Sequence, residues 1–164
     1  MAGQCRRRRV AGLRHTSRGF SLIELMVGLA VLAILIAIAV PSYRSIIAEQ
    51  RVRATIADLH SAISLARSEA IKRNRQITLA PAGGGWLAGW GIASPVSGQP
   101  AILAHTLSSG VGITGPGSIA FSASGRVSAA SEFEVSSDTT ESPDSVSCLT
   151  LGLDGRASSA KGGC

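Results

Sequence analysis

Residues 20–40 read FSLIELMVGLAVLAILIAIAV, an unbroken apolar run of 21 residues in which Glu24 is the one charged side chain. A helix of this length rises about 1.5 Å per residue and is long enough to cross a hydrocarbon core of about 30 Å. The preceding residues, 1–19, carry six arginines and no acidic side chain. Because basic residues favour the cytoplasmic end of a membrane span, the sequence predicts a cytoplasmic N-terminus and an extracytoplasmic remainder.

The positive charge of the chain is confined to this start. The whole sequence of 164 residues has a net charge of +6, and the six leading arginines account for all of it, since residues 20–164 hold ten basic and ten acidic side chains. The charge is therefore not a signal for nucleic-acid binding by the rest of the chain. The length allows one modest domain and excludes a multidomain enzyme. Aromatic residues make up only 4%, so the core must be largely aliphatic.

Two simple interpretations of the apolar run explain less than the sequence offers. A plain membrane anchor leaves Glu24 without a role, and a carboxylate inside a lipid-facing helix costs roughly 2–3 kcal/mol. A secretory signal peptide would use Ala37-Ile38-Ala39 as its cleavage site, but the run is longer than the usual apolar region of about 7–15 residues and it contains an acid.

The stretch Arg18-Gly19-Phe20-Ser21-Leu22-Ile23-Glu24-Leu25 resembles the leader junction of type IV pilins and pseudopilins. In that family a basic leader ends in Gly, the mature chain begins with Phe, and Glu occupies its fifth position. Here these residues are Gly19, Phe20 and Glu24. The resemblance covers the leader charge, the cleavage residue, the new N-terminal residue, the acid spacing and the aliphatic helix that follows.

This resemblance implies a defined processing and location. A prepilin peptidase would remove residues 1–19 after Gly19, and Phe20 would become the N-methylated first residue. The protein would cross the inner membrane once, with its head in the periplasm, and join a filament that reaches the cell surface. In the filament, Glu24 would pair with the Phe20 amine of a neighbouring pilin or pseudopilin, which gives the buried carboxylate a partner.

The helical pattern continues beyond the apolar run to about Arg75. An apolar stripe recurs at steps of three and four residues: Val52, Ile56, Leu59, Ile63, Ala66 and Ala70. We therefore expect a transmembrane or filament-core helix over 20–41 and an amphipathic helix over 42–75. Pro41 removes a backbone donor and predicts a kink between them.

From Gln76 onward the sequence predicts a β-rich head over 76–164. Short apolar runs alternate with Gly, Pro, Ser and Thr, which is typical of strands separated by turns. The expected strands are Gln76–Ala80, Trp86–Ala93, Ala101–Leu107, Ser118–Ser122, Glu132–Ser136 and Val146–Leu151. One long helix followed only by strands predicts an α+β fold, with a small antiparallel sheet packed on the amphipathic part of the helix.

The head also resembles the GspH/FimT branch of minor pilins and pseudopilins. That branch has a Gly-Trp strand, then a strand ending in Gly-Arg, then a Cys-bearing strand that leads to a final Gly-Arg. The matching segments are Gly89-Trp90-Gly91-Ile92, Ile119-Ala120-Phe121 with Gly125-Arg126, and Cys148 through Gly155-Arg156.

Of the three cysteines, Cys5 lies in the leader and would be discarded. Cys148 and Cys164 remain as an even pair in a predicted oxidising compartment, so we expect a disulfide that closes a C-terminal loop. A loop of about 15 residues closed in this way stabilises a domain by about 3 kcal/mol in the chain-entropy model. Two free thiols are the alternative.

The sequence predicts no enzyme, no cofactor and no metal site. Gly110-Val111-Gly112-Ile113-Thr114-Gly115 matches G-x-G-x-x-G in letters, but Pro116-Gly117 follows where a dinucleotide site needs a helix. His60 and His105 accompany no nucleophile motif, and we expect both to be structural.

Two functions remain open from the sequence. The first is a non-enzymatic minor pilin or pseudopilin that assembles into or primes a type IV pilus or a type II secretion pseudopilus. The alternative, which the resemblance implies, is a DNA-binding minor pilin for DNA uptake, because some FimT-type proteins bind DNA through a C-terminal Gly-Arg-x-Arg loop. Here the loop reads Gly155-Arg156-Ala157-Ser158, so the second arginine is absent and Lys161 would take its place. Against DNA, residues 76–164 hold three basic and six acidic side chains, a net charge of −3.

Overall fold

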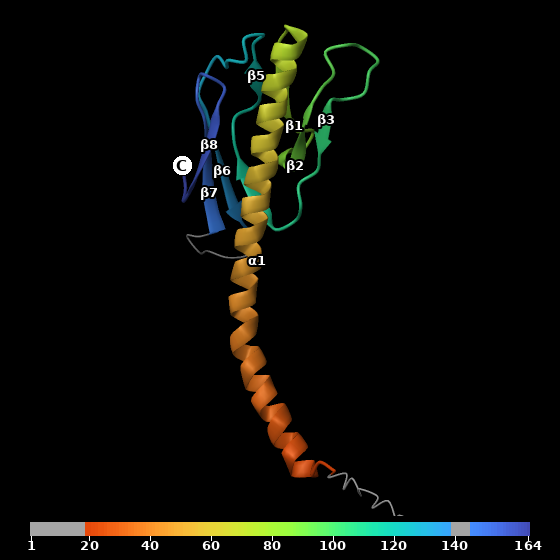
Figure 1. The fold of residues 1–164 in the computed structure, drawn as a ribbon, viewed down its shortest axis with the longest axis vertical. Helices are drawn as coiled ribbons and strands as arrows, with labels where there is room; N and C mark the ends of the chain where they lie inside the picture. Colours follow the sequence, from red (N-terminus) through yellow and green to blue (C-terminus); the bar gives the residue numbers. More distant parts are fainter. Residues whose placement is uncertain (1–18, 139–144) are drawn as a thin grey trace, which may run out of the picture. The chain divides into compact units, whose positions relative to one another are not determined.

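The computed structural model describes residues 19–138 and 145–164, and in these residues the chain forms one long helix followed by short strands (Figure 1). The elements in chain order are α1 (Leu22–Arg73), β1 (Ile77–Ala82), β2 (Gly85–Ile92), β3 (Leu103–His105), β4 (Val111–Thr114), β5 (Ile119–Phe121), β6 (Ser131–Ser137), β7 (Val146–Leu151) and β8 (Ala157–Lys161). The α+β prediction is confirmed. The chain divides into two compact units, before and after the Ala39–Val40 bond.

The first unit contains the start of α1. The Ser21 hydroxyl accepts a 3.2 Å hydrogen bond from the Glu24 backbone N–H, and the Leu25 N–H donates to the Ser21 carbonyl, so Ser21 is the N-cap. The apolar side chains of this unit are exposed all round the helix. By length and composition, α1 can cross a membrane. The helical assignment runs through residue 41, and the kink expected at Pro41 stays a prediction.

The second unit is the head, which includes α1 from residue 40 onward. All six residues of the predicted apolar stripe are buried, from Val52 to Ala70. The helix ends with two backbone bonds, from Asn74 N–H to Ile71 carbonyl and from Arg75 N–H to Ala70 carbonyl. Asn74 has a positive φ of 50°, which makes this end a Schellman motif with asparagine at the left-handed position. The chain thereby turns back to lay β1 along the helix.

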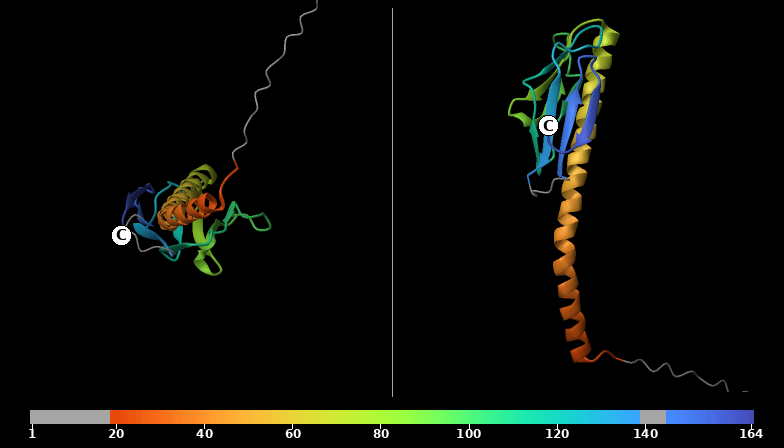
Figure 2. Two further views of the ribbon diagram at one scale, coloured as in Figure 1. Left: turned by 90° about the horizontal axis from the view of Figure 1, so that it is seen from below. Right: turned by 90° about the vertical axis from the view of Figure 1, so that its left-hand side faces the viewer.

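The strands form two four-stranded antiparallel sheets where the sequence predicts one. Their orders are β3-β2-β1-β5 and β4-β6-β7-β8. Figure 2 shows both sheets lying along one side of the head part of α1. The buried stripe of the helix therefore closes a core whose other walls are the inner faces of both sheets.

Aromatic side chains join the two sheets inside this core. Trp86 on β2 packs edge-on against Phe133 on β6, with ring centroids 4.9 Å apart, and its indole N–H donates a 2.6 Å hydrogen bond to the Pro116 carbonyl. Trp90 is 1% exposed and stacks on His105 at 4.2 Å. Both tryptophans therefore belong to the core of the head.

Two strands differ from the expected set. The segment β4 lies inside the glycine-rich run and pairs with β6, from Val111 opposite Ser137 to Thr114 opposite Glu134. The polar segment β8 pairs along its length with β7, from Leu151 opposite Ala157 to Ser147 opposite Lys161. Both segments become strands because they pair with another strand, β6 for β4 and β7 for β8. Their own alternation of apolar and polar residues is too weak to predict a strand.

The C-terminal disulfide forms as the sequence predicts. Cys148 on β7 and Cys164 are bonded, with their Cα atoms 5.1 Å apart. The Cys164 backbone N–H also donates a 3.1 Å hydrogen bond to Oε2 of Glu134 on β6. The end of the chain is thereby held against two strands of the second sheet. Cys5 lies outside the described residues.

Candidate functional site

The leader junction is exposed at the start of α1. Gly19 and Phe20 precede the helix, and Phe20 is 82% exposed. Ser21 caps the helix immediately after them. The arginines of the leader lie outside the described residues, so the basic part of the junction is not placed. This exposed dipeptide is therefore accessible from solvent in the described chain.

Glu24 lies in the first turn of α1 and is exposed in the isolated chain. A carboxylate in the first turn interacts favourably with the positive end of the helix dipole. Its neighbours Leu22, Ile23 and Leu25 are all more than half exposed. The acid therefore sits within a long apolar surface that nothing in the described chain covers.

The loop containing Arg156 is the tight turn between β7 and β8. The Gly155 N–H donates to the Gly152 carbonyl at 2.9 Å, and the Gly152 N–H donates to the Arg156 carbonyl at 3.0 Å. Asp154 accepts a 3.1 Å bond from the Arg156 N–H, and its carboxylate lies 3.6 Å from Nε of the same arginine. The Arg156 side chain is 79% exposed, so the turn presents it to solvent.

A second turn of the same geometry lies beside the first. In residues 122–126 the Gly125 N–H donates to the Ser122 carbonyl at 2.8 Å, and the Ser122 N–H donates to the Arg126 carbonyl at 2.9 Å. Gly125 and Gly155 both have positive φ, 76° and 74°. A side chain on Gly155 would collide with the Gly125 carbonyl oxygen. The Gly-Arg repeat is visible in the sequence, but its adjacency in space is not.

Lys161 lies at the far end of β8 from Arg156, about 16 Å away at about 3.3 Å per residue. Its Nζ donates a 2.8 Å hydrogen bond to Oε1 of Glu49 on α1. Arg53 contacts the same oxygen at 2.5 Å. Hydrogen bonds from Lys161 and then Arg53 hold the pKa of Glu49 below its usual range. The structure does not bring Lys161 and Arg156 into one cluster.

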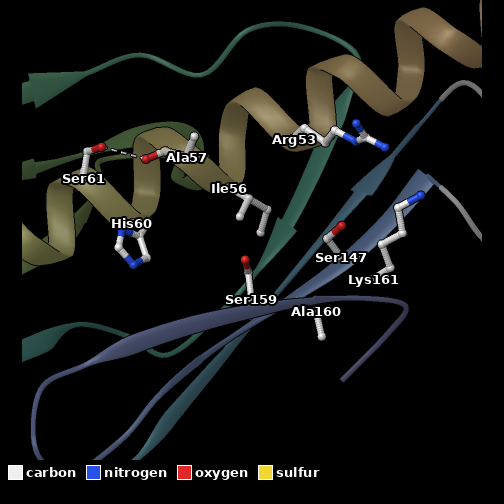
Figure 3. Close-up of a pocket in the computed structure, with 9 residues that line it drawn as sticks. All are labelled: Arg53, Ile56, Ala57, His60, Ser61, Ser147, Ser159, Ala160 and Lys161. Atoms are coloured by element: carbon white, nitrogen blue, oxygen red, sulfur yellow. Dashed lines mark hydrogen bonds between the residues drawn. The ribbon is translucent and has the colours of Figure 1, made fainter.

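A groove of about 510 Å³ separates α1 from β7 and β8 beside this ion pair (Figure 3). Arg53, His60, Ser147, Ser159 and Lys161 line it. The hydroxyl of Ser61 donates to the Ala57 carbonyl of its own helix at 2.8 Å. Within residues 19–138 and 145–164, no group of histidine, cysteine and acidic side chains is arranged to hold a metal.

The second histidine, His105, has a structural environment. It stacks on Trp90, and its Nε2 lies 3.9 Å from Oδ2 of Asp58 on α1. This contact joins β3 to the helix.

Arg67 is a residue whose position the sequence does not reveal. In the sequence it is a charge beside the apolar stripe, whereas the structure places it under the two Gly-Arg turns.

Comparisons with known proteins agree with these features. A family model described as type II transport protein GspH matches residues 55–155. A model of the prokaryotic N-terminal methylation motif matches residues 14–40, which include the Gly19–Phe20 junction and Glu24. None of the curated protein sequences compared with the chain matches it.

The fold is similar to solved structures of two minor subunits. The type IV minor pilin FimU of Pseudomonas aeruginosa, in two crystal forms, has TM-scores of 0.56 and 0.55 and identities of 18% and 19%; the match covers 66% of this chain and 87% and 91% of FimU. The minor pseudopilin EpsH of the Vibrio cholerae type 2 secretion system has a TM-score of 0.53 at 13% identity, covering 68% of this chain and 97% of EpsH.

The GspH model matches more than half of the chain, and the methylation motif covers the junction and the apolar helix that the structure leaves exposed. The chain therefore belongs to the GspH family of minor pilins and pseudopilins, the type IV pilin-like proteins of type IV pili and type II secretion.

Proposed function

We propose that this protein is a non-enzymatic minor subunit that inserts in the inner membrane and then assembles into, or primes, a type IV pilus or type II secretion pseudopilus. The observation that carries the proposal is the wholly exposed apolar start of α1, which directly follows the Gly19–Phe20 junction. Such a surface needs lipid or other apolar helices around it. In a filament core, the equivalent helices of neighbouring subunits would supply this apolar surrounding in place of lipid.

In this role the prepilin peptidase cuts after Gly19 and leaves a free amine on Phe20, which is then methylated. The positive charges of residues 1–19 keep the leader on the cytoplasmic side, so the head lies in the periplasm. In the filament, Glu24 pairs with the Phe20 amine of a neighbour. An intramembrane acid and an amine that both lack a partner are costly, and pairing removes both costs at once while fixing the axial position of the subunit.

The test is incorporation of the full chain into filaments, with processing measured separately. Glu24→Ala should still be cleaved, as the mass of the mature chain will show. The variant should, however, be absent from filaments that are sheared from the cells. Glu132→Ala removes an exposed acid from the head and serves as the matched control. Normal incorporation of Glu24→Ala would refute the pairing. Gly19→Val should block cleavage itself and leave the uncut precursor in the membrane.

DNA binding during uptake is the second function we consider, and the exposure of Arg156 on a projecting turn favours it. Lys161 is a weaker candidate, because it is bonded to Glu49 at the other end of β8. The test is the binding of fluorescent double-stranded DNA to the full chain across a salt series. Binding that weakens with salt and drops for Arg156→Ala supports the function. If no binding occurs even at low salt, DNA binding is refuted and the assembly role is the function that remains.

A further inference from the structure

A cavity of about 470 Å³ lies where the last turns of α1 meet the β7–β8 turn. Its polar lining consists of the side chains of His60, Ser64, Arg67, Ser68 and Arg156. Among the described residues no carboxylate lines it. The hydroxyl of Ser68 is already used as a donor to the Leu65 carbonyl. The remaining groups are two guanidiniums, one hydroxyl and one imidazole, a set that favours an anion.

Arg67 is held in this cavity by packing alone. A side-chain carbon on Gly125 would lie 3.2 Å from its Cγ, and one on Gly155 would lie 3.4 Å from its Nε, so the two turns close over the arginine stem. Its Nε is buried and has no hydrogen-bond partner among the described residues. A buried N–H without a partner is destabilising, and a bound ion is one of the arrangements that satisfy such a group in native structures.

Arg156 lines the same cavity from the β7–β8 turn, which is fixed by backbone hydrogen bonds. Its one acidic contact, Asp154, is 3.6 Å away and 58% exposed, which is a loose pairing that a ligand can replace. Arginine pairs bind tetrahedral oxyanions well because each planar guanidinium offers parallel donors. The matching arginine of the neighbouring turn, Arg126, does not line the cavity.

We propose that this cavity binds a phosphate group, with Arg67 and Arg156 as its two charged donors and Ser64 and His60 completing the site. The phosphate is either free or part of a nucleic-acid backbone. The proposal does not rest on filament assembly, because no residue of the exposed apolar helix takes part. It adds Arg67, a helix residue, to any anion binding that Arg156 alone would provide.

The experiment is a titration with inorganic phosphate of the full chain in detergent, at about 150 mM salt. The affinity of every variant is measured by isothermal titration calorimetry, and in the native chain the buried Nε–H resonance of Arg67 should shift with the same midpoint. Arg67→Met and Arg156→Gln should each weaken phosphate binding at least about tenfold, since each removes a charge-assisted hydrogen bond. Arg126→Gln is the matched control from the same kind of turn and should change the affinity by less than about threefold.

Saturable binding with this pattern supports the site. No saturation, or equal losses from Arg126→Gln and Arg156→Gln, overturns it. If Arg67→Met unfolds, the comparison between the two exposed turn arginines still decides. A short DNA duplex is then added as a competitor: displacement of phosphate assigns the site to a nucleic-acid backbone, and no displacement assigns it to free phosphate. Failure of filament incorporation would leave both readouts unchanged.

Discussion

Lys161 on β8 donates a 2.8 Å hydrogen bond to Glu49 on α1, across a sequence separation of 112 residues. The strand that carries the lysine contributes almost nothing to the core, and four of its five residues are exposed. Its position therefore depends largely on the ladder with β7, the Cys148–Cys164 bond and this ion pair with the helix. Each of these attachments can be tested separately.

The Lys161–Glu49 pair should contribute little to stability. Both side chains are partly exposed, 57% and 25%, so solvent and salt screen their attraction. A double-mutant cycle with Lys161→Met and Glu49→Gln, measured by urea unfolding of the full chain in detergent, should give a coupling close to zero. A coupling as large as those of buried pairs would contradict the exposure that the structure gives to this pair.

Acid should destabilise the head through its helix glutamates. Contacts with Lys161 and Arg53 lower the pKa of Glu49, and a hydrogen bond from Arg73 lowers that of Glu69, both from an ordinary value of 4.5. A lowered pKa in the folded state means that stability is present above pH 4.5 and is lost as the pH falls through the lowered values. Unfolding midpoints between neutral and acid pH measure this loss. The double variant Glu49→Gln, Glu69→Gln should have a flatter acid slope, and an unchanged slope would contradict the prediction.

Gly155→Ala should be strongly destabilising. It forces a side chain into a φ of 74° and against the Gly125 carbonyl, so we expect a loss of about 2 kcal/mol or more in the free energy of unfolding. Gly117→Ala is the control, because a methyl group there meets nothing within 4 Å. The control should lie within about 0.5 kcal/mol of the native chain. Equal effects at the two sites would mean that the paired turns do not constrain the head.

Loss of the disulfide should release β8. Cys164→Ser opens a loop with a sequence separation of 16 residues, and the expected loss is about 3 kcal/mol. Hydrogen exchange of the amides in 157–161 should rise more than that of β6. Cys5→Ser, in the leader sequence, is the control for removal of a cysteine that takes no part in this bond. Unchanged protection of β8 in Cys164→Ser would show that the ladder with β7 is sufficient by itself.

Much of this fold is predictable from local pattern. The stripe from Val52 to Ala70 is visible at its spacing of three and four, and the expected strands match β1, β2, β5, β6 and β7 within a few residues. The strand expected over Ala101–Leu107 is shorter, Leu103–His105, since it pairs only with the end of β2. The division into two sheets is not visible, because it follows from β1 pairing with β5 and β4 pairing with β6 over long separations.

The candidate sites show the same limit. Gly19, Phe20 and Glu24 are contiguous, so a linear motif reveals them. The cavity of Arg67 and Arg156 joins a helix to a turn nearly 90 residues later, and no spacing rule connects them. Lys161 shows the opposite error: it is near Arg156 in sequence, but an extended strand carries it to the other end of the sheet.

The two core tryptophans give the head an intrinsic fluorescence signal. Both tryptophans of the chain, Trp86 and Trp90, lie within 6.4 Å of each other, and one touches Phe133 of the second sheet while the other stacks on His105 near the helix. Intrinsic fluorescence therefore measures whether the helix and the two sheets are packed together, and no added dye is needed. Since residues 20–40 contain no tryptophan, any spectral change that accompanies the proposed assembly would originate in the head.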